Sequence, residues 1–182
     1  MEKNNTKKYK LGFTLFEMVI VIGIISILTG ISFTYYGKYS EGKKLEGEVK
    51  KLSNAISLAS KKSSSGDQIN CTNFIGYRIY IQSTGTAWSY DIQKCCGNSF
   101  VCEEELSDVA NYNLPNNISI TSSSVSTLLF KKLGNGLVIN SNESIQSATI
   151  TLKNGSLNTK NCVDLSINKA GVVEINERYD CI

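Results

Sequence analysis

Two patterns of apolar residues divide the first third of the chain. In residues 13–36 apolar side chains form a nearly continuous run, in which Glu17 is the one side chain charged at neutral pH. This length is enough for a helix that spans a bilayer, which needs about 20 residues. In residues 37–62 apolar positions recur at helical spacing among Lys and Glu, which predicts an amphipathic helix. The positions of this apolar stripe are Leu45, Val49, Leu52, Ile56 and Ala59.

Both patterns are helical, so together they predict one helix of about 50 residues that begins at Phe13. The stretch from Ser63 to Asp67, which contains three serines and a glycine, is expected to end it. Gly23, Gly30 and Gly37 are spaced by seven residues and so lie near one face. They are either a seam for close helix contact or incidental glycines, which membrane helices tolerate.

Beyond residue 66 the pattern changes to short alternating runs bounded by turn residues, which predicts strands. Thr84-Gly85 and Lys169-Ala170-Gly171 are expected to turn two hairpins, and residues 95–105 are expected to form a loop. The expected fold class is α+β, with the long helix packed on an antiparallel domain of about seven or eight strands. The strands are expected at residues 77–81, 88–92, 118–121, 128–132, 137–140, 147–153, 162–167 and 172–175.

Charge is concentrated before the apolar run. The chain of 182 residues has a formal charge of +3, and residues 1–12 hold four lysines against one glutamate. The remaining residues therefore carry no net charge, and the basic character is not a nucleic-acid footprint. Basic residues that precede a membrane span stay in the cytoplasm, so the β domain is expected on the outer side of the membrane.

Glu17 is the anomaly of the apolar run. A carboxylate in the hydrocarbon region costs about 2.5–3.5 kcal/mol on insertion scales, so such a residue usually has a partner. The run contains no Lys or Arg. Cleavage after Gly12 would create a cation, the α-amine of Phe13, one helical turn from Glu17 or within reach of it on a neighbouring subunit. The alternative is a signal anchor with a stray Glu near the membrane interface.

The segment Lys10-Leu11-Gly12 followed by Phe13-Thr14-Leu15-Phe16-Glu17 and an apolar run resembles the N-terminal signal of type IV pilins and type II secretion pseudopilins. The resemblance covers roughly residues 7–36. It implies cleavage between Gly12 and Phe13 by a prepilin peptidase, N-methylation of Phe13, and a role for Glu17 in subunit register. Many pilins have a proline in the second half of this segment; here none precedes Pro115, so no proline kink is expected.

The resemblance also implies an organisation, partners and a location. It implies a structural filament subunit, a pilin, minor pilin or pseudopilin, with a pilin-like fold. Its partners would be like or related subunits and an inner-membrane assembly platform, and it would move from the cytoplasmic membrane into a periplasmic or extracellular filament. The alternative is a membrane-anchored extracytoplasmic binding domain that does not polymerise. The expected segments are a leader at 1–12, a membrane helix at 13–36, its amphipathic continuation at 37–65 and a β domain at 66–182.

The cysteines all lie on the expected outer side. An even count in an exported domain predicts disulfides. Zinc is the rival reading, but the chain has no His and no Cys-x-x-Cys pair, and buried reduced thiols are a further alternative. The candidates for disulfides are Cys71, Cys95, Cys96, Cys102, Cys162 and Cys181.

Strand register suggests one of the pairs. In a hairpin centred near Ala170, residue 162 lies opposite about residue 178, so Cys181 is expected to curl back to Cys162. This pair also resembles the C-terminal disulfide of many pilins. Adjacent cysteines rarely bond to each other, so Cys95 and Cys96 are expected to take separate partners. Cys71 is then expected to reach into the loop that Cys102 ends.

No motif for catalysis is present. Without His there is no Ser-His or Cys-His nucleophile, and no glycine loop for phosphate occurs. Glu103-Glu104-Glu105 could supply acids or bind a cation, but an acidic run is usually a solvated loop. We therefore expect no enzyme, no cofactor and no metal site.

Overall fold

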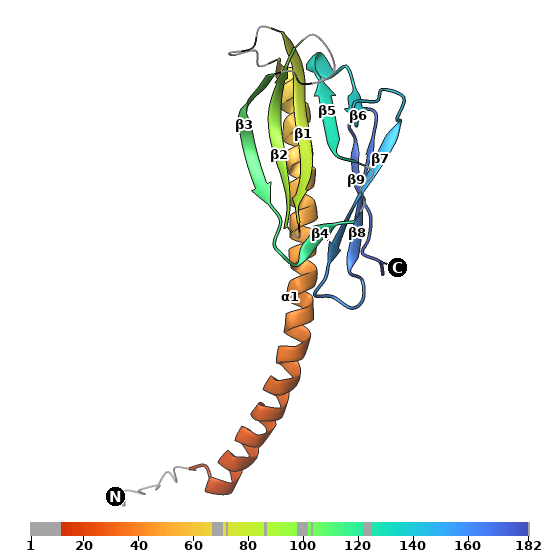
Figure 1. Ribbon diagram of the computed structural model, residues 1–182. Coiled ribbons are helices and arrows are strands. Elements are labelled where there is room, and N and C mark those ends of the chain that lie inside the picture. Colours follow the sequence, from red (N-terminus) through yellow and green to blue (C-terminus); the bar gives the residue numbers. More distant parts are fainter. Residues whose placement is uncertain are drawn as a thin grey trace, which may run out of the picture. The chain divides into compact units, whose positions relative to one another are not determined.

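The computed structural model describes residues 12–66, 71, 73–85, 87–97, 102, 104–121 and 125–181; residues 32–34 and 104–108 are described by their backbone alone. The chain divides into two compact units, Met1–Tyr39 and Ser40–Ile182. Figure 1 shows the elements, which are one long helix followed by antiparallel strands. The α+β fold class expected from the sequence is confirmed.

The helix, α1, is Leu15–Ser65 and contains 51 residues, in agreement with the expected length. It begins two residues later than expected, at Leu15 rather than at Phe13. It ends among the serines, where Gly66 has a φ of +67° and its N–H donates to the carbonyl of Ser63. A glycine with positive φ directly after the last turn is the usual way for a helix to stop.

The strands form two sheets in which every pair of neighbours is antiparallel. The five-stranded sheet has the order β3-β2-β1-β5-β6, and the four-stranded sheet has the order β4-β7-β8-β9. A short 3₁₀ turn, η1 (Lys132–Gly134), joins β5 to β6. The strands are β1 (Phe74–Thr84), β2 (Ala87–Cys96), β3 (Glu104–Asn113), β4 (Ile118–Ile120), β5 (Thr127–Lys131), β6 (Leu137–Ile139), β7 (Ser147–Asn154), β8 (Cys162–Asn168) and β9 (Val173–Ile175).

The loop predicted at residues 95–105 is shorter than expected at both ends. Cys95 and Cys96 are the last residues of β2, and β3 begins at Glu104, so nine strands are described instead of seven or eight. The sequence of β3 gives no clean alternation. Its pairing with β2 shifts register on both sides of Gln93, and each shift breaks the two-residue period along the strand.

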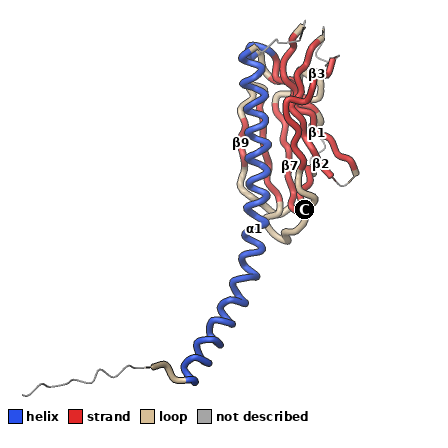
Figure 2. Tube along the Cα trace, turned by 90° about the vertical axis from the view of Figure 1, so that its left-hand side faces the viewer, coloured by secondary structure: helices blue, strands red, loops and turns tan. Residues whose placement is uncertain are grey.

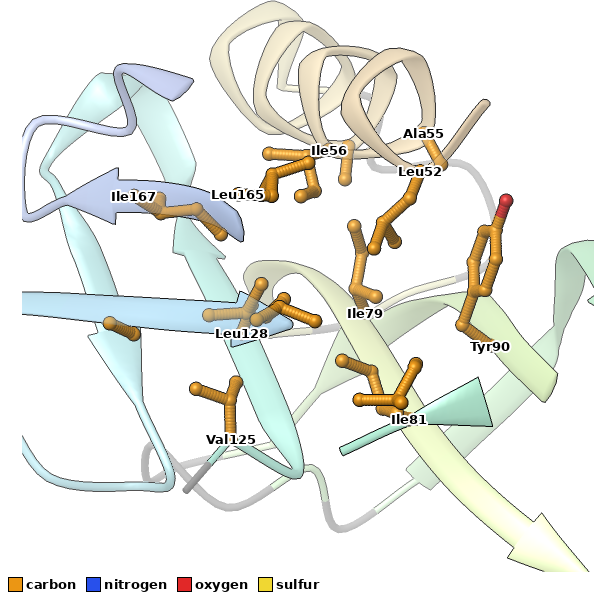
Figure 3. Close-up of a cluster of buried hydrophobic side chains, with 14 of the residues drawn as sticks. Leu52, Ala55, Ile56, Ile79, Ile81, Tyr90, Val125, Leu128, Leu165 and Ile167 are labelled. Atoms are coloured by element: carbon orange, nitrogen blue, oxygen red, sulfur yellow. The ribbon is translucent and has the colours of Figure 1, made fainter. Parts of the chain in front are cut away.

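The apolar stripe of α1 packs against the inner faces of the sheets in the Ser40–Ile182 unit. Leu52 and Ile56 are fully buried and face Ile79 of β1 and Leu165 of β8 (Figure 3). Figure 2 shows the C-terminal part of α1 running along the strands. Burying a side chain of this size stabilises a fold by about 1.5–3 kcal/mol, so the stripe is the main attachment of the helix to the sheets.

Ser63 adds a polar connection at the end of this packing. Its hydroxyl donates to the carbonyl of Phe130 on β5 at 2.6 Å and accepts from the N–H of Tyr77 on β1 at 2.7 Å. The side chain is buried, with 1% exposed. One hydroxyl thus satisfies two backbone groups where the last turn of α1 meets the sheet.

Candidate functional site

The start of α1 is capped by its own sequence. The N–H of Glu17 donates to Oγ1 of Thr14 at 3.2 Å, and the N–H of Met18 donates to the carbonyl of Thr14. Thr14 is therefore the N-cap residue and Glu17 the third helical residue, the spacing of a capping box. The sequence analysis missed this role of Thr14, although the Thr-x-x-Glu spacing is a recognised signal. A carboxylate in the first turn is also favoured by the helix dipole.

Because the helix begins at Leu15, the peptide bond between Gly12 and Phe13 lies outside it. Both residues are exposed, Phe13 with 76% of its surface accessible. A Cβ atom added at Gly12 would meet no atom within 4 Å, so the packing of the described residues does not require glycine here.

The apolar side chains that follow are not buried by the described part of the chain. All large apolar side chains from Leu15 to Ile31 that the structure describes are exposed, and α1 is long and apolar enough to cross a membrane. Ser26 and Thr29 donate to carbonyls one turn earlier, which hides their hydroxyls within the helix. This apolar surface could contact a bilayer or other apolar helices. It is what a membrane-anchored protein is expected to have.

Glu17 is exposed on this apolar surface, and its carboxylate has no ion-pair partner among the residues that the structure describes. A Cβ atom added at Gly23, Gly30 or Gly37 would also meet nothing within 4 Å. These positions leave room for another helix to approach closely.

Glu41, at the start of the second unit, ties α1 to a turn of the four-stranded sheet. Its carboxylate accepts from Asn117 at 2.6 Å and from the fully buried Asn154 at 3.1 Å, and it pairs with Lys44. The hydrogen bond from Lys44, followed by that from Asn154, lowers the pKa of Glu41 below its ordinary value. Sequence reasoning missed this cluster because its members are far apart in the chain.

The described cysteines form three disulfides, and none is free. Tyr179 pairs with Cys162 as an isolated bridge, one residue from the expected register, and this leads the chain back to the last disulfide. The adjacent cysteines of β2 take separate partners. The bonds join Cys71 to Cys96, Cys95 to Cys102 and Cys162 to Cys181, with Cα–Cα distances of 5.9, 4.9 and 5.6 Å.

The acidic residues considered as candidates for a metal or acid site do not form one among the described residues. Among the described residues no group of three or more Cys, Asp or Glu could hold a metal ion. Glu103 lies outside the described residues, and Glu104 and Glu105 are described only as the first residues of β3. The cleavage and assembly candidates Gly12, Phe13 and Glu17 do lie together, at the start of α1.

Comparison with known proteins gives a match at the N-terminal end of the chain. No curated protein and no solved structure matches the chain. Residues 7–33 match the family model of the prokaryotic N-terminal methylation motif, which includes the exposed Gly12–Phe13 bond and the capped start of α1. This part of the chain is therefore the signal of type IV pilins and pseudopilins, and it indicates a pilin-like structural protein.

Proposed function

We propose that this chain is a structural subunit, a pilin, minor pilin or pseudopilin, of a type IV pilus or a type II secretion-like filament. The observation that carries the proposal is the methylation motif on an apolar helical surface that nothing in the described chain covers. Apolar surface of this extent is rare on soluble monomers and marks a membrane or protein contact. A subunit that passes from bilayer to filament uses the same surface for both.

In this proposal a prepilin peptidase removes residues 1–12 and methylates the new amine of Phe13. The accessible bond after Gly12 and the absence of any packing need for glycine support such processing. The cation that Glu17 lacks is then the α-amine of Phe13, on the same chain or on a neighbour. Pairing the two groups removes much of the cost of holding the carboxylate in an apolar environment, and it fixes the register between helices.

The β domain is proposed to lie on the outer side of the cytoplasmic membrane, and later in a periplasmic or extracellular filament. Three disulfides fit an oxidising compartment, and the lysines of residues 1–12 favour a cytoplasmic N-terminus. The proposed partners are the peptidase, an inner-membrane assembly platform, and like or related subunits. The second candidate is an anchored binding domain that does not polymerise.

Mass spectrometry of the mature chain, from membranes and from sheared filaments, tests the proposal. We expect a chain that begins at methylated Phe13 in both fractions. An intact N-terminus, or cleavage beyond the apolar run, would contradict the processing step. A processed chain that is found only in membranes would favour the anchored binding domain.

A further inference from the structure

A groove of about 360 Å³ lies within the Ser40–Ile182 unit, between α1 and the C-terminal residues. Its apolar lining comes from Val49 of α1, Val163 of β8 and Ile175 of β9. The two valines are buried, whereas Ile175 is 45% exposed. The groove is thus an open space with an apolar lining that the described chain does not fill.

Charged side chains surround this lining. Lys50, Lys160 and Arg178 are basic, and Glu46 and Glu177 are acidic. Glu46 is already neutralised, because its carboxylate contacts the amine of Lys43 at 2.7 Å and Nε of Arg178 at 3.4 Å. The hydrogen bond from Lys43 accordingly lowers the pKa of Glu46.

Lys160 differs from Glu46 and Arg178, which form an ion pair. Its amine has no hydrogen-bond or ion-pair partner within the part of the chain that the structure describes. The rim therefore offers a cation beside an apolar surface, which suits an occupant that combines apolar side chains with carboxylates.

The basic side of the groove is held in place before any occupant arrives. Lys160 has a φ of +48°, a conformation that costs energy for a residue with a side chain, and its N–H donates to the carboxylate of Asp180. The next residue, Asn161, accepts from the N–H of Cys181 at 2.9 Å, beside the last disulfide. These bonds fix the loop that presents the Lys160 amine.

Arg178 is placed by close contact with the helix. A Cβ atom added at Gly42 would lie 2.0 Å from Nη1 of Arg178, so the absence of a side chain at Gly42 makes room for the guanidinium. The ion pair with Glu46 holds its other side. A groove built this way loses little conformational freedom on binding.

The chain itself contains a segment of complementary character. Residues 100–105 read Phe-Val-Cys-Glu-Glu-Glu, two apolar side chains followed by the one run of three acidic residues in the sequence. Cys102 of this segment is bonded to Cys95, and the segment leads into β3, an edge strand of the five-stranded sheet. Figure 1 shows β3 and β9 on opposite sides of the β domain.

We propose that the groove binds residues 100–105 of a second copy of this chain, with the carboxylates at Lys160 and Lys50 and the apolar side chains over Ile175. This inference rests on the proposed function as a filament subunit. A contact between two different surfaces of the same protein is heterologous, and repetition of such a contact produces an open helical array when its rotation does not close into a ring.

The strand register gives the displacement between two copies, measured along α1, that this contact requires. Glu104 lies opposite Cys96, Cys96 lies opposite Phe74, and this end of the sheet is bonded to Ser63 of α1 through Tyr77. The groove lies at Lys50. Since a helix rises about 1.5 Å per residue, the two copies must be displaced by about 20 Å along α1.

A carbodiimide, which joins a lysine amine directly to a contacting carboxylate, tests the contact in filaments of the full chain. Two copies are co-expressed. One keeps the groove lysines but has Gln at 103, 104 and 105; the other keeps the three glutamates but has Lys50→Arg and Lys160→Arg. A cross-link from Lys50 or Lys160 to residues 103–105 can then arise only between copies, and peptide mass spectrometry is expected to find it.

Charge variants of the full chain supply a second readout, the amount of chain in sheared filaments. Lys160→Arg keeps the charge and is expected to assemble within about twofold of wild type. Lys160→Glu opposes three carboxylates and is expected to reduce assembly about tenfold, because like charges disfavour an interface strongly. Adding Glu104→Lys to Lys160→Glu is expected to restore most of the loss. Lys132→Glu, an exposed reversal outside the groove, is the matched control.

The failures are distinguishable. If the wild-type chain is abundant in filaments but no such cross-link forms, or if Lys160→Glu assembles like Lys132→Glu, the groove contact is wrong and the proposed function stands. A cross-link from the groove to a different protein would likewise assign another occupant and overturn it. If the processed wild-type chain never enters filaments, the proposed function fails and the groove contact fails with it. Intact disulfides and an unchanged Tm show that each variant is folded.

Discussion

The helix α1 carries two apolar stretches with opposite fates. From Leu15 to Ile31 the described large apolar side chains are exposed, whereas those of the stripe from Leu45 to Ala59 are buried against the sheets. Within the described chain, the second stretch of this helix is thus packed against the sheets, and the first is not. Burial inside the domain accounts for the stripe, whereas the exposed N-terminal stretch is long and apolar enough to cross a membrane and fits a membrane-anchored protein.

The largest expected effect is at the leader. Gly12→Val is expected to abolish processing, since a β-branched side chain crowds the bond to be cleaved, while open space around Gly12 means that the fold is unaffected. Immunoblots would show the mass of the unprocessed chain. Gly23→Ala, also in open space, is the control and should be processed normally. Equal mature masses for wild type and Gly12→Val would refute the leader assignment.

A second change separates membrane insertion from assembly. Glu17→Ala is expected to leave insertion intact or improved, because it removes a charge that costs about 2.5–3.5 kcal/mol in the membrane. Filament incorporation should nevertheless fall, because the amine of Phe13 would lose its proposed partner. Sheared and membrane fractions are compared by quantitative immunoblot. If Glu17→Ala entered filaments as efficiently as wild type, the proposed pairing of Glu17 with the Phe13 amine would be wrong.

The glycines sharpen the comparison between the two regions. A Cβ atom at Gly76 of β1 would lie 1.8 Å from the carbonyl oxygen of Phe130, in the backbone of β5. Gly76→Ala is therefore expected to destabilise the β domain by more than about 3 kcal/mol. Thermal unfolding of the purified full chain measures this loss. Gly30→Ala, in open space, is expected to leave the unfolding transition of the β domain in place.

A matched pair of truncations tests the two stretches of α1 directly. Leu52→Ala removes a fully buried side chain and is expected to cost about 2–5 kcal/mol in the free energy of unfolding. Ile24→Ala removes an exposed one and should leave that free energy unchanged while it weakens membrane retention. Denaturant unfolding and membrane extraction give the two readouts. Similar losses of stability in both variants would contradict the division.

The smallest expected effect concerns pH and Glu41. Its pKa is lowered in the folded chain from 4.5, mainly by the hydrogen bond from Lys44. Such a group stabilises the fold above the unfolded pKa, and this contribution disappears as pH falls through the folded pKa. Wild type should therefore lose more stability than Glu41→Gln between pH 4.5 and lower values. Parallel falls of Tm in both proteins would show that Glu41 does not contribute.

Much of the fold follows from the residue pattern. The helical spacing from Leu45 to Ala59 predicted the amphipathic part of α1 and its buried face. Clean alternation predicted β7, and the turn at Lys169-Ala170-Gly171 predicted the hairpin of β8 and β9. The strand β3 was missed because Gln93 of β2 sits between two register shifts, so no period survives for a sequence reader to find. Buried polar links such as Ser63 were missed as well, since nothing local distinguishes that serine from its neighbours.

The disulfides show the same limit on what the sequence pattern can predict. Hairpin register brought Cys162 and Cys181 together, but it left the partner of Cys71 open between two adjacent cysteines. The packing supplies the reason for the observed bonds: Cys71 lies against the main core, whereas Cys95 and Cys102 belong to a separate cluster with Leu129. Which cluster a cysteine joins is a property of the folded sheet and cannot be counted from spacing.

The cap at Thr14 has a consequence for the rate of the proposed cleavage. A protease acts on extended backbone, so a scissile bond inside a helix is cut only after local opening, which adds its free energy to the activation barrier. Because Thr14 ends the helix before Phe13, the bond after Gly12 already lies outside the hydrogen-bonded turns. In the proposed processing, unwinding of the substrate helix would therefore add nothing to the activation barrier for cleavage.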